Sequence, residues 1–153
     1  MPDLKNSAVQ RHVMEVFFRA YQAFTAKPDE MLARRGLSRV HHRILFFIAS
    51  HPALSVGELL EHLGVSKQAL NTPLRQLIEM GLVVSAPAEG DKRKRLLALS
   101  GAGEKLERTL RREQIRHVQR VFADMGEPAV AGWLSVNQAL ADRPPKKPAA
   151  AKV

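Results

Sequence analysis

The sequence has 153 residues, which is enough for one compact domain or for a small domain with an attached helical lobe. Lysine and arginine number 24 against 15 aspartates and glutamates, so the formal net charge is +9, which favours a polyanionic partner. Nucleic acid is the commonest such partner and an acidic membrane the rival, although excess cations also serve simply as a solubilising surface. The absence of cysteine excludes disulfides, thiolate zinc sites and cysteine redox switches.

The beginning of the chain does not have the form of a signal peptide, because Arg11 and His12 interrupt any apolar run. The longest strongly apolar stretch, residues 44–49, is far too short to span a bilayer. We therefore expect a cytoplasmic protein.

Two helices are expected at the start of the chain. Apolar residues recur at three- and four-residue spacing across residues 8–26, and Lys27-Pro28-Asp29 is expected to break this first helix. Residues 39–50 form the second, with Ser38 as its N-cap and Pro52 ending it.

Residues 55–83 have the pattern of a helix-turn-helix. Ser55 and Glu58 form a capping box, and Gly64 ends the first short helix in a left-handed conformation. Ser66 caps the next helix only two residues later, and Gly81 closes it. So tight a turn between two short helices is typical of this motif.

The rest of the chain returns first to strands and then to helices. A strand at 82–86, a turn at 87–91 and a return strand at 95–99 predict a β-hairpin, followed by helices at 102–123 and 127–140. The predicted fold class is mainly α with a small β-hairpin. We expect a winged helix-turn-helix domain at 38–101, a helical dimerisation lobe built from 8–26 and 102–141, and a flexible basic tail at 144–153.

The second helix of a helix-turn-helix enters the major groove of DNA, and its early residues reach base edges. Glutamine and asparagine can pair with adenine, and lysine with guanine. The residues at and after the start of this helix that avoid its apolar side are expected to contact DNA, the last two of them at phosphates: Ser66, Lys67, Gln68, Asn71, Thr72, Arg75 and Gln76.

The hairpin carries four cations in five residues, Asp91-Lys92-Arg93-Lys94-Arg95. A basic wing can place arginine in the narrow minor groove, where the negative potential is enhanced. Asp91 is expected to hold a neighbouring arginine by a bidentate pair, so that its guanidinium is aimed at the groove.

The stretch from Ser55 to Gly103 resembles the MarR family of winged-helix regulators. The matching positions are Ser66, Leu77, Gly81-Leu82-Val83, Asp91-Lys92-Arg93, Leu99-Ser100 and Gly103. Including the flanking helices, the resemblance extends over roughly residues 8–141. It implies a triangular homodimer, with Arg93 as the minor-groove arginine and Asp91 as its anchor.

Two positions depart from the family pattern. Pro73 stands inside the recognition helix, where relatives have an aliphatic residue, and Thr72 stands where they often have arginine. Because proline removes an amide donor and clashes with the preceding turn, we expect a kink and altered base contacts.

Many members of the family release DNA when a small aromatic acid binds, and such a pocket needs apolar walls and cationic or donor groups. The strings KPDEMLARRGLSRVHHRIL and KQALNTPLRQL are similar to the subgroup that controls nicotinate breakdown, which implies 6-hydroxynicotinate as effector. The candidate ligand-binding residues, any of which is also explained as a core or surface residue, are Phe17, Arg19, Tyr21, His41, His42 and Arg43.

We therefore expect a sequence-specific repressor that binds a pseudo-palindromic double-stranded operator as a homodimer. The alternatives are a non-specific architectural DNA-binding protein and a metal-responsive regulator using His41 and His42. No catalytic motif is present, so an enzyme is not expected, and no cofactor is implied beyond the aromatic effector. The lysines of the tail are too few for membrane attachment.

Overall fold

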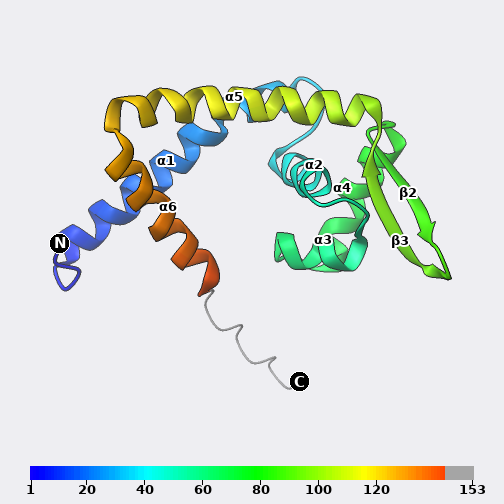
Figure 1. Ribbon diagram of the computed structural model, residues 1–153, viewed down its shortest axis with the longest axis horizontal. Helices are drawn as coiled ribbons and strands as arrows, with labels where there is room; N and C mark the ends of the chain where they lie inside the picture. Colours follow the sequence, from blue (N-terminus) through cyan, green and yellow to red (C-terminus); the bar gives the residue numbers. More distant parts are fainter. Residues whose placement is uncertain (144–153) are drawn as a thin grey trace, which may run out of the picture. The chain divides into compact units, whose positions relative to one another are not determined.

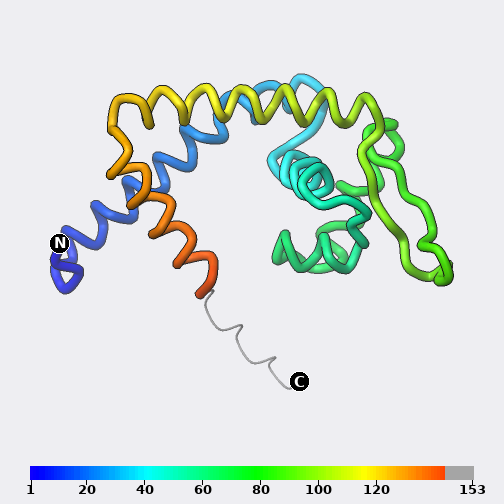
Figure 2. Tube along the Cα trace, in the orientation of Figure 1, coloured from blue at the N-terminus to red at the C-terminus, as the bar shows by residue number. Residues whose placement is uncertain are grey.

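The computed structural model describes residues 1–143 and is mainly helical with one small sheet, as predicted (Figures 1 and 2). The chain forms two compact units, the first ending at Ile115 and the second beginning at Arg116. The predicted tail at 144–153 lies outside the described residues. The elements in chain order are α1 (Ser7–Ala33), α2 (Arg39–Ser50), β1 (Leu54–Ser55), α3 (Val56–Leu63), α4 (Lys67–Glu79), β2 (Val83–Ala88), β3 (Asp91–Leu99), α5 (Gly101–Met125) and α6 (Glu127–Asp142).

Helix α1 does not break at Pro28, so the predicted end at residue 26 is wrong. A proline inside a helix leaves the carbonyl four residues earlier without its usual donor. Here that carbonyl belongs to Phe24, and the side chain of Gln114 on α5 lies close enough to donate to it, with Nε2 to oxygen at 3.4 Å. Pro28 itself is fully buried. Tertiary contacts therefore hold the helix together across a residue that interrupts it locally.

The core of the first unit gathers around α2. Helix α2 has five buried residues and packs against α1, α3, α4 and β3. The most completely buried leucines come from every neighbouring element. They are Leu32, Leu45, Leu54, Leu59, Leu70, Leu77, Leu82, Leu97 and Leu110.

The helix-turn-helix forms as predicted. Ser55 caps α3, with its hydroxyl accepting from the backbone N–H of Glu58 at 3.1 Å. The Glu58 carboxylate accepts from that same hydroxyl at 2.9 Å, and so does not reach the backbone N–H of the cap as expected. Gly64 ends α3 with φ of 63°, a left-handed conformation that glycine adopts without a side-chain penalty.

The sheet has three antiparallel strands in the order β1-β3-β2, one strand more than the predicted hairpin. The extra strand is only two residues long, with Leu54 opposite Leu97 and Ser55 opposite Leu96. A two-residue strand carries no periodicity that a sequence could reveal, because its pairing depends on where α2 and α3 deliver the chain.

Helix α5 begins against the end of α4. The Ser100 hydroxyl donates to the Gly81 carbonyl at 2.6 Å and accepts from the Gly103 N–H at 3.0 Å. Gly103 lies against the backbone of Leu82, closely enough that a Cβ at this position would overlap the Leu82 carbonyl oxygen. These contacts explain the Leu-Ser-x-x-Gly pattern at this corner.

Two helices leave large apolar side chains uncovered in the single chain. Helix α1 has no buried residue before Thr25, and Phe17 and Phe18 are 57% and 60% exposed. In the second unit α6 has no buried residue at all, although Trp133 meets Phe122 of α5 edge-on at 5.4 Å between ring centroids. Such faces are typical of an interface with another chain.

Candidate nucleic-acid interface

Helix α4 separates a buried side from an exposed polar side. Leu70, Pro73, Leu74 and Leu77 are buried against the core. Every residue of α4 predicted to contact DNA is exposed, as is the cap Ser66, so the structure places them together on the solvent side of the helix. These residues are Ser66, Lys67, Gln68, Asn71, Thr72, Arg75 and Gln76.

The start of α4 is set by its cap. The Ser66 hydroxyl accepts from the backbone N–H of Ala69 at 3.2 Å, and Lys67 is the first helical residue. The first turn contains no acidic residue. Its free amides and the positive end of the helix dipole therefore face any approaching phosphate without competition from a carboxylate in that turn.

Pro73 does not end α4, which continues as a single helix to Glu79. Pro73 belongs to the buried side of the helix, together with Leu70, Leu74 and Leu77. The carbonyl that loses its usual donor is that of Ala69, an exposed residue, so water can replace the missing amide. Helix α4 is thus continuous at Pro73, the position that departs from the family pattern.

The hairpin is longer and its turn shorter than predicted. Strand β2 continues to Ala88 and β3 already begins at Asp91, so only Glu89 and Gly90 form the turn, with Gly90 at φ of 78°. The prediction that residues 87–91 form the turn is therefore wrong. The two strands still pair beyond residue 86 because β2 lies at the edge of the sheet, where a proline is tolerated. Pro87 lacks one N–H, but the other backbone groups of β2 can still bond to β3.

The basic segment opens β3, next to the tip of the hairpin (Figure 1), where the pairing with β2 is irregular. The register changes from Pro87 opposite Arg95 to Ala88 opposite Asp91. The intervening Lys92, Arg93 and Lys94 consequently have no partner position on β2, and all three side chains are exposed. This arrangement bulges three consecutive cations out of the wing, where they can follow a groove or backbone.

Asp91 and Arg95 both make hydrogen bonds within the hairpin. The Asp91 carboxylate accepts from the backbone N–H of Arg93 at 3.0 Å, and none of the ion pairs within residues 1–143 joins Asp91 to an arginine guanidinium. The Arg95 guanidinium bonds to the hydroxyl and the carbonyl of Ser85 across the hairpin, at 3.0 and 2.9 Å. Among the described residues, the guanidinium of Arg93 makes neither an ion pair with Asp91 nor a hydrogen bond to Ser85.

His41 connects α2 to the recognition helix. Its Nδ1 lies 3.0 Å from the backbone nitrogen of Ser38, and its Nε2 lies 2.7 Å from Oε1 of Gln76. The imidazole is buried while Gln76 is exposed. Neither the histidine contact nor the orientation of Gln76 follows from sequence spacing, because the two residues are 35 positions apart.

The six candidate ligand-binding residues do not gather into one site. Phe17, Arg19 and Arg43 are exposed, and Arg19 pairs with Glu15 on its own helix. His41 is occupied on both ring nitrogens, as described above. Tyr21 is also exposed and lies against Arg39 of α2, whereas His42 is buried near Asp29 of α1 and Glu107 of α5.

A polar network lies between α1 and α2. Arg39 bonds to Asp29 at 2.6 Å, and its guanidinium carbon lies 5.1 Å from the ring centre of Tyr21. The other carboxylate oxygen of Asp29 is buried without a hydrogen-bond partner in the described chain. Burial lowers the pKa of His42, and the carboxylates of Asp29 and Glu107 oppose this effect.

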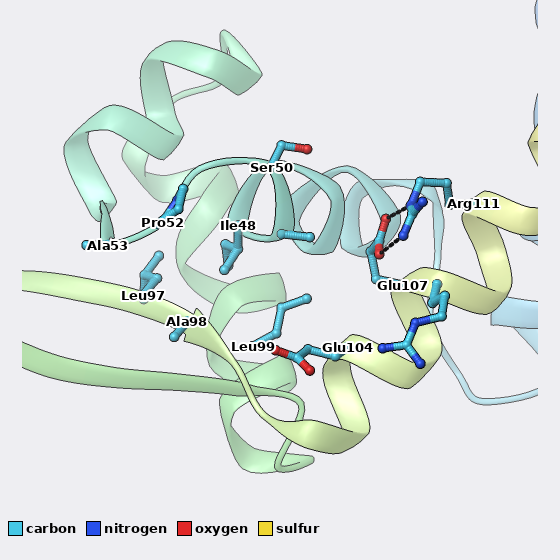
Figure 3. Close-up of a pocket in the computed structure, with 12 residues that line it drawn as sticks. Ile48, Ser50, Pro52, Ala53, Leu97, Ala98, Leu99, Glu104, Glu107 and Arg111 are labelled. Carbon is cyan, nitrogen blue, oxygen red and sulfur yellow. Dashed lines mark hydrogen bonds and ion pairs between the residues drawn. The ribbon is translucent and has the colours of Figure 1, made fainter.

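A cleft of about 680 Å³ opens between the end of α2, strand β3 and the start of α5 (Figure 3). Ile48, Leu97 and Leu99 provide apolar wall, and Glu107 pairs with Arg111 at its edge at 2.9 Å. None of the six predicted ligand residues lines this cleft. Sequence reasoning missed it because its walls come from three separated segments.

The described residues also bear on metal binding and membrane attachment. Within residues 1–143, histidine and carboxylate side chains form no group of three or more that could hold a metal ion. In the same part of the chain, no helix is both long and apolar enough to cross a membrane.

Comparisons with known proteins identify the fold and the family. Residues 35–94 match the model of the MarR family. The HTH-type transcriptional regulator PetP of Rhodobacter capsulatus is 42% identical over 132 residues, which cover 86% of this chain and 80% of PetP.

Two solved structures share the fold at low sequence identity. NadR in complex with 4-hydroxyphenylacetate superposes with a TM-score of 0.71 at 22% identity, covering 85% of this chain and 90% of NadR. The S. aureus MepR–DNA complex gives a TM-score of 0.70 at 16% identity, covering 85% of this chain and 97% of MepR. With the fold, the capped helix-turn-helix and the basic wing in agreement, this chain belongs to the MarR family of winged helix-turn-helix, DNA-binding transcriptional regulators.

Proposed function

We propose that this regulator binds a pseudo-palindromic DNA operator as a homodimer and represses transcription until a small aromatic carboxylate releases it. The observation that carries the proposal is the bulge of Lys92, Arg93 and Lys94 on the wing that follows the exposed polar side of α4. A polar helix can read the major groove while a basic wing contacts the adjacent minor groove and backbone. The MepR–DNA complex shows that this fold accommodates DNA in a relative.

The dimer is supported by the uncovered apolar residues of α1 and α6. Two copies related by a two-fold axis present two recognition helices, and an operator with matching half-site symmetry follows from that geometry. The whole proposal is tested first on DNA from immediately upstream of the protein's own gene.

The test is a titration of that DNA, and of random DNA of equal length, with the wild type and two arginine variants. We expect discrete, competitor-resistant binding that Arg93→Ala weakens by at least about tenfold, as for loss of a desolvated charged contact. Arg35→Ala, which removes the same charge from an exposed position in the turn between α1 and α2, serves as control and is expected to change affinity much less. Equal binding to random DNA would support the architectural alternative.

For the effector we propose a pyridine or benzene carboxylate, with 6-hydroxynicotinate as the first compound to test. Two features support this chemistry: the cleft combines apolar walls with Arg108 and Arg111, beside the carboxylates of Glu104 and Glu107, and Arg39 lies over the ring of Tyr21. NadR, a relative in fold, was solved with 4-hydroxyphenylacetate, which is also an aromatic carboxylate.

Calorimetry with 6-hydroxynicotinate and 4-hydroxyphenylacetate tests the effector on the wild type, Arg108→Ala and Tyr21→Ala. Loss of binding in Arg108→Ala alone would assign the ligand to the cleft, and loss in Tyr21→Ala alone would assign it to the network between α1 and α2. No heat with 6-hydroxynicotinate, while DNA binding is intact, would exclude the nicotinate assignment.

A further inference from the structure

We propose that His41 is a positioning residue for DNA binding: it fixes the side-chain amide of Gln76 with its NH₂ group outward, as a donor to a DNA phosphate. This inference rests on the proposed DNA-binding function and adds a specific residue to it. It begins with the two hydrogen bonds of the His41 ring, one to the start of its own helix and one to α4.

The first bond determines which ring nitrogen carries the proton. The backbone N–H of Ser38 lies 3.0 Å from Nδ1 of His41, and a backbone amide can only donate. Nδ1 must therefore present its lone pair. The Ser38 hydroxyl, 3.1 Å from the same nitrogen, is then also a donor. The ring proton is therefore on Nε2.

The second bond determines the orientation of Gln76. Because Nε2 is the donor, the atom of the Gln76 amide that faces it at 2.7 Å must be the acceptor oxygen. The nitrogen of the amide is then turned away from His41. A glutamine amide is otherwise ambiguous between two orientations, and here the Ser38 amide decides between them through the imidazole.

His41 occupies the third position of α2, where a capping box has glutamate or glutamine. A glutamate or glutamine side chain there accepts from the N–H of the N-cap residue. The imidazole does the same through Nδ1, and its rigid ring also carries Nε2, which points the opposite way toward Gln76. Burial of His41 at 6% exposure leaves it little freedom to turn. The cap of α2 and the orientation of a residue on α4 are thereby joined in one unit.

The position of Gln76 on α4 favours a phosphate as the target. At 100° per residue, the side of α4 opposite its buried residues is centred on Gln68, Thr72 and Arg75, and Gln76 lies at the flank of that side next to α2. Residues at the centre are placed for base edges, and flanking residues for the sugar–phosphate backbone. The fixed NH₂ group is a suitable donor for such an oxygen.

The experiment is a double-mutant cycle read by DNA affinity on operator and on random DNA. We expect His41→Ala and Gln76→Ala each to weaken binding by about threefold to tenfold, the effect of one neutral hydrogen bond. The double variant should be no weaker than Gln76→Ala alone. Because a phosphate contact is independent of sequence, the losses should be equal on both DNAs, with the salt dependence unchanged since no cation is removed.

Two isosteric variants make the test independent of folding. His41→Gln keeps an acceptor for Ser38 and a donor toward Gln76, and should bind DNA within about twofold of wild type. Gln76→Glu, at an exposed position, still accepts from His41 but directs its second oxygen outward, and should weaken binding more than Gln76→Ala. Melting temperatures identify any variant that loses DNA binding through unfolding.

Nitrogen-15 NMR of the free protein supplies the readout that affinity does not. The His41 resonances should report a neutral ring protonated at Nε2, and Gln76→Ala should shift Nε2 more than Nδ1. A ring protonated at Nδ1, or multiplicative losses in the cycle, overturns the inference. A wild type that binds random DNA as tightly as operator DNA would overturn the regulator proposal, but the double-mutant cycle would still measure the coupling between His41 and Gln76. Losses of affinity confined to operator DNA would assign Gln76 to a base and overturn the phosphate contact.

Discussion

At the scale of single residues, the histidines of α2 show how burial changes the meaning of a sequence position. His41 and His42 are adjacent, and both were candidates for ligand or metal binding. The structure buries both of them, each at 6% exposure, and gives them different surroundings. His41 is held by hydrogen bonds to Ser38 and Gln76, whereas His42 is placed among the charges of Asp29 and Glu107.

The shifted pKa of His42 predicts how stability depends on pH. Burial lowers the pKa of the folded-state imidazole below its ordinary value of 6.5, against the opposing effect of the carboxylates of Asp29 and Glu107. As the pH falls through about 6.5 the unfolded chain takes up a proton that the folded chain resists, so the free energy of unfolding decreases. Urea denaturation at pH 7.5, 6.5 and 5.5 should show this decrease, and His42→Gln should reduce its slope.

The control for this measurement is His12→Gln, which removes an exposed imidazole from α1. Loss of the slope in both variants, or in neither, would contradict the assignment to His42. The direction also matters, because a gain of stability on acidification would mean that the carboxylates outweigh burial.

At the scale of elements, the DNA-reading helix and the corner behind it depend on two small residues. Ser66 begins α4 by capping it, and Gly103 lets α5 approach the backbone of Leu82. A matched pair of variants tests each residue. For Ser66 the pair separates helix capping from DNA binding, and for Gly103 it separates the close backbone contact from the general effect of replacing a glycine.

For Ser66, the pair is Ser66→Asn and Ser66→Asp. Both residues are good N-caps, so the free energy of unfolding should stay within about 0.5 kcal/mol of wild type in each. The aspartate adds a negative charge at the exposed end of α4 that is expected to face phosphate, so it should bind DNA at least about tenfold more weakly than the asparagine variant. Equal affinities, measured at one salt concentration, would remove this end of α4 from the interface.

For Gly103, the pair is Gly103→Ala and Gly101→Ala, two residues apart at the start of α5. A Cβ at 103 would overlap the Leu82 carbonyl oxygen, and forcing backbone apart typically costs about 1–3 kcal/mol or more. At 101 nothing lies within 4 Å, so alanine should change the free energy of unfolding by less than about 1 kcal/mol. Chemical denaturation measures both, and similar values would indicate that α5 can move away from Leu82.

At the scale of the whole molecule, the apolar residues of α6 predict assembly. Trp133, Val136 and Leu140 lie on one side of the helix at 100° per residue, and all are more than half exposed. We expect light scattering to give twice the 17.0 kDa mass of the chain, with a melting temperature that rises with protein concentration.

Val136→Glu should disrupt that dimer, since an unpaired carboxylate would be buried between the copies. Ser135→Glu, on the opposite side of α6, is the control and should leave the mass unchanged. Because a monomer has only one recognition helix, Val136→Glu should also lower operator affinity by more than tenfold. A dimeric, fully active Val136→Glu would exclude this side of α6 from the interface.

Local signals in the sequence were sufficient for the helix-turn-helix, because caps, glycines and apolar periodicity act over a few residues. Ser38, Ser55, Ser66 and Gly64 all lie where these signals placed them. The exposed side of α4 followed from the same periodicity, so the candidate DNA-binding residues could be named before the structure. Their contacts with DNA remain predictions.

Only the tertiary structure decided the features that depend on distant partners. Helix α1 passes through Pro28 because Gln114 and the surrounding core replace what proline removes. The irregular register that bulges Lys92, Arg93 and Lys94 depends on pairing across the hairpin, and the amide orientation of Gln76 depends on a histidine 35 residues away. Sequence periodicity reports which side of an element is apolar, but not which distant group will meet it.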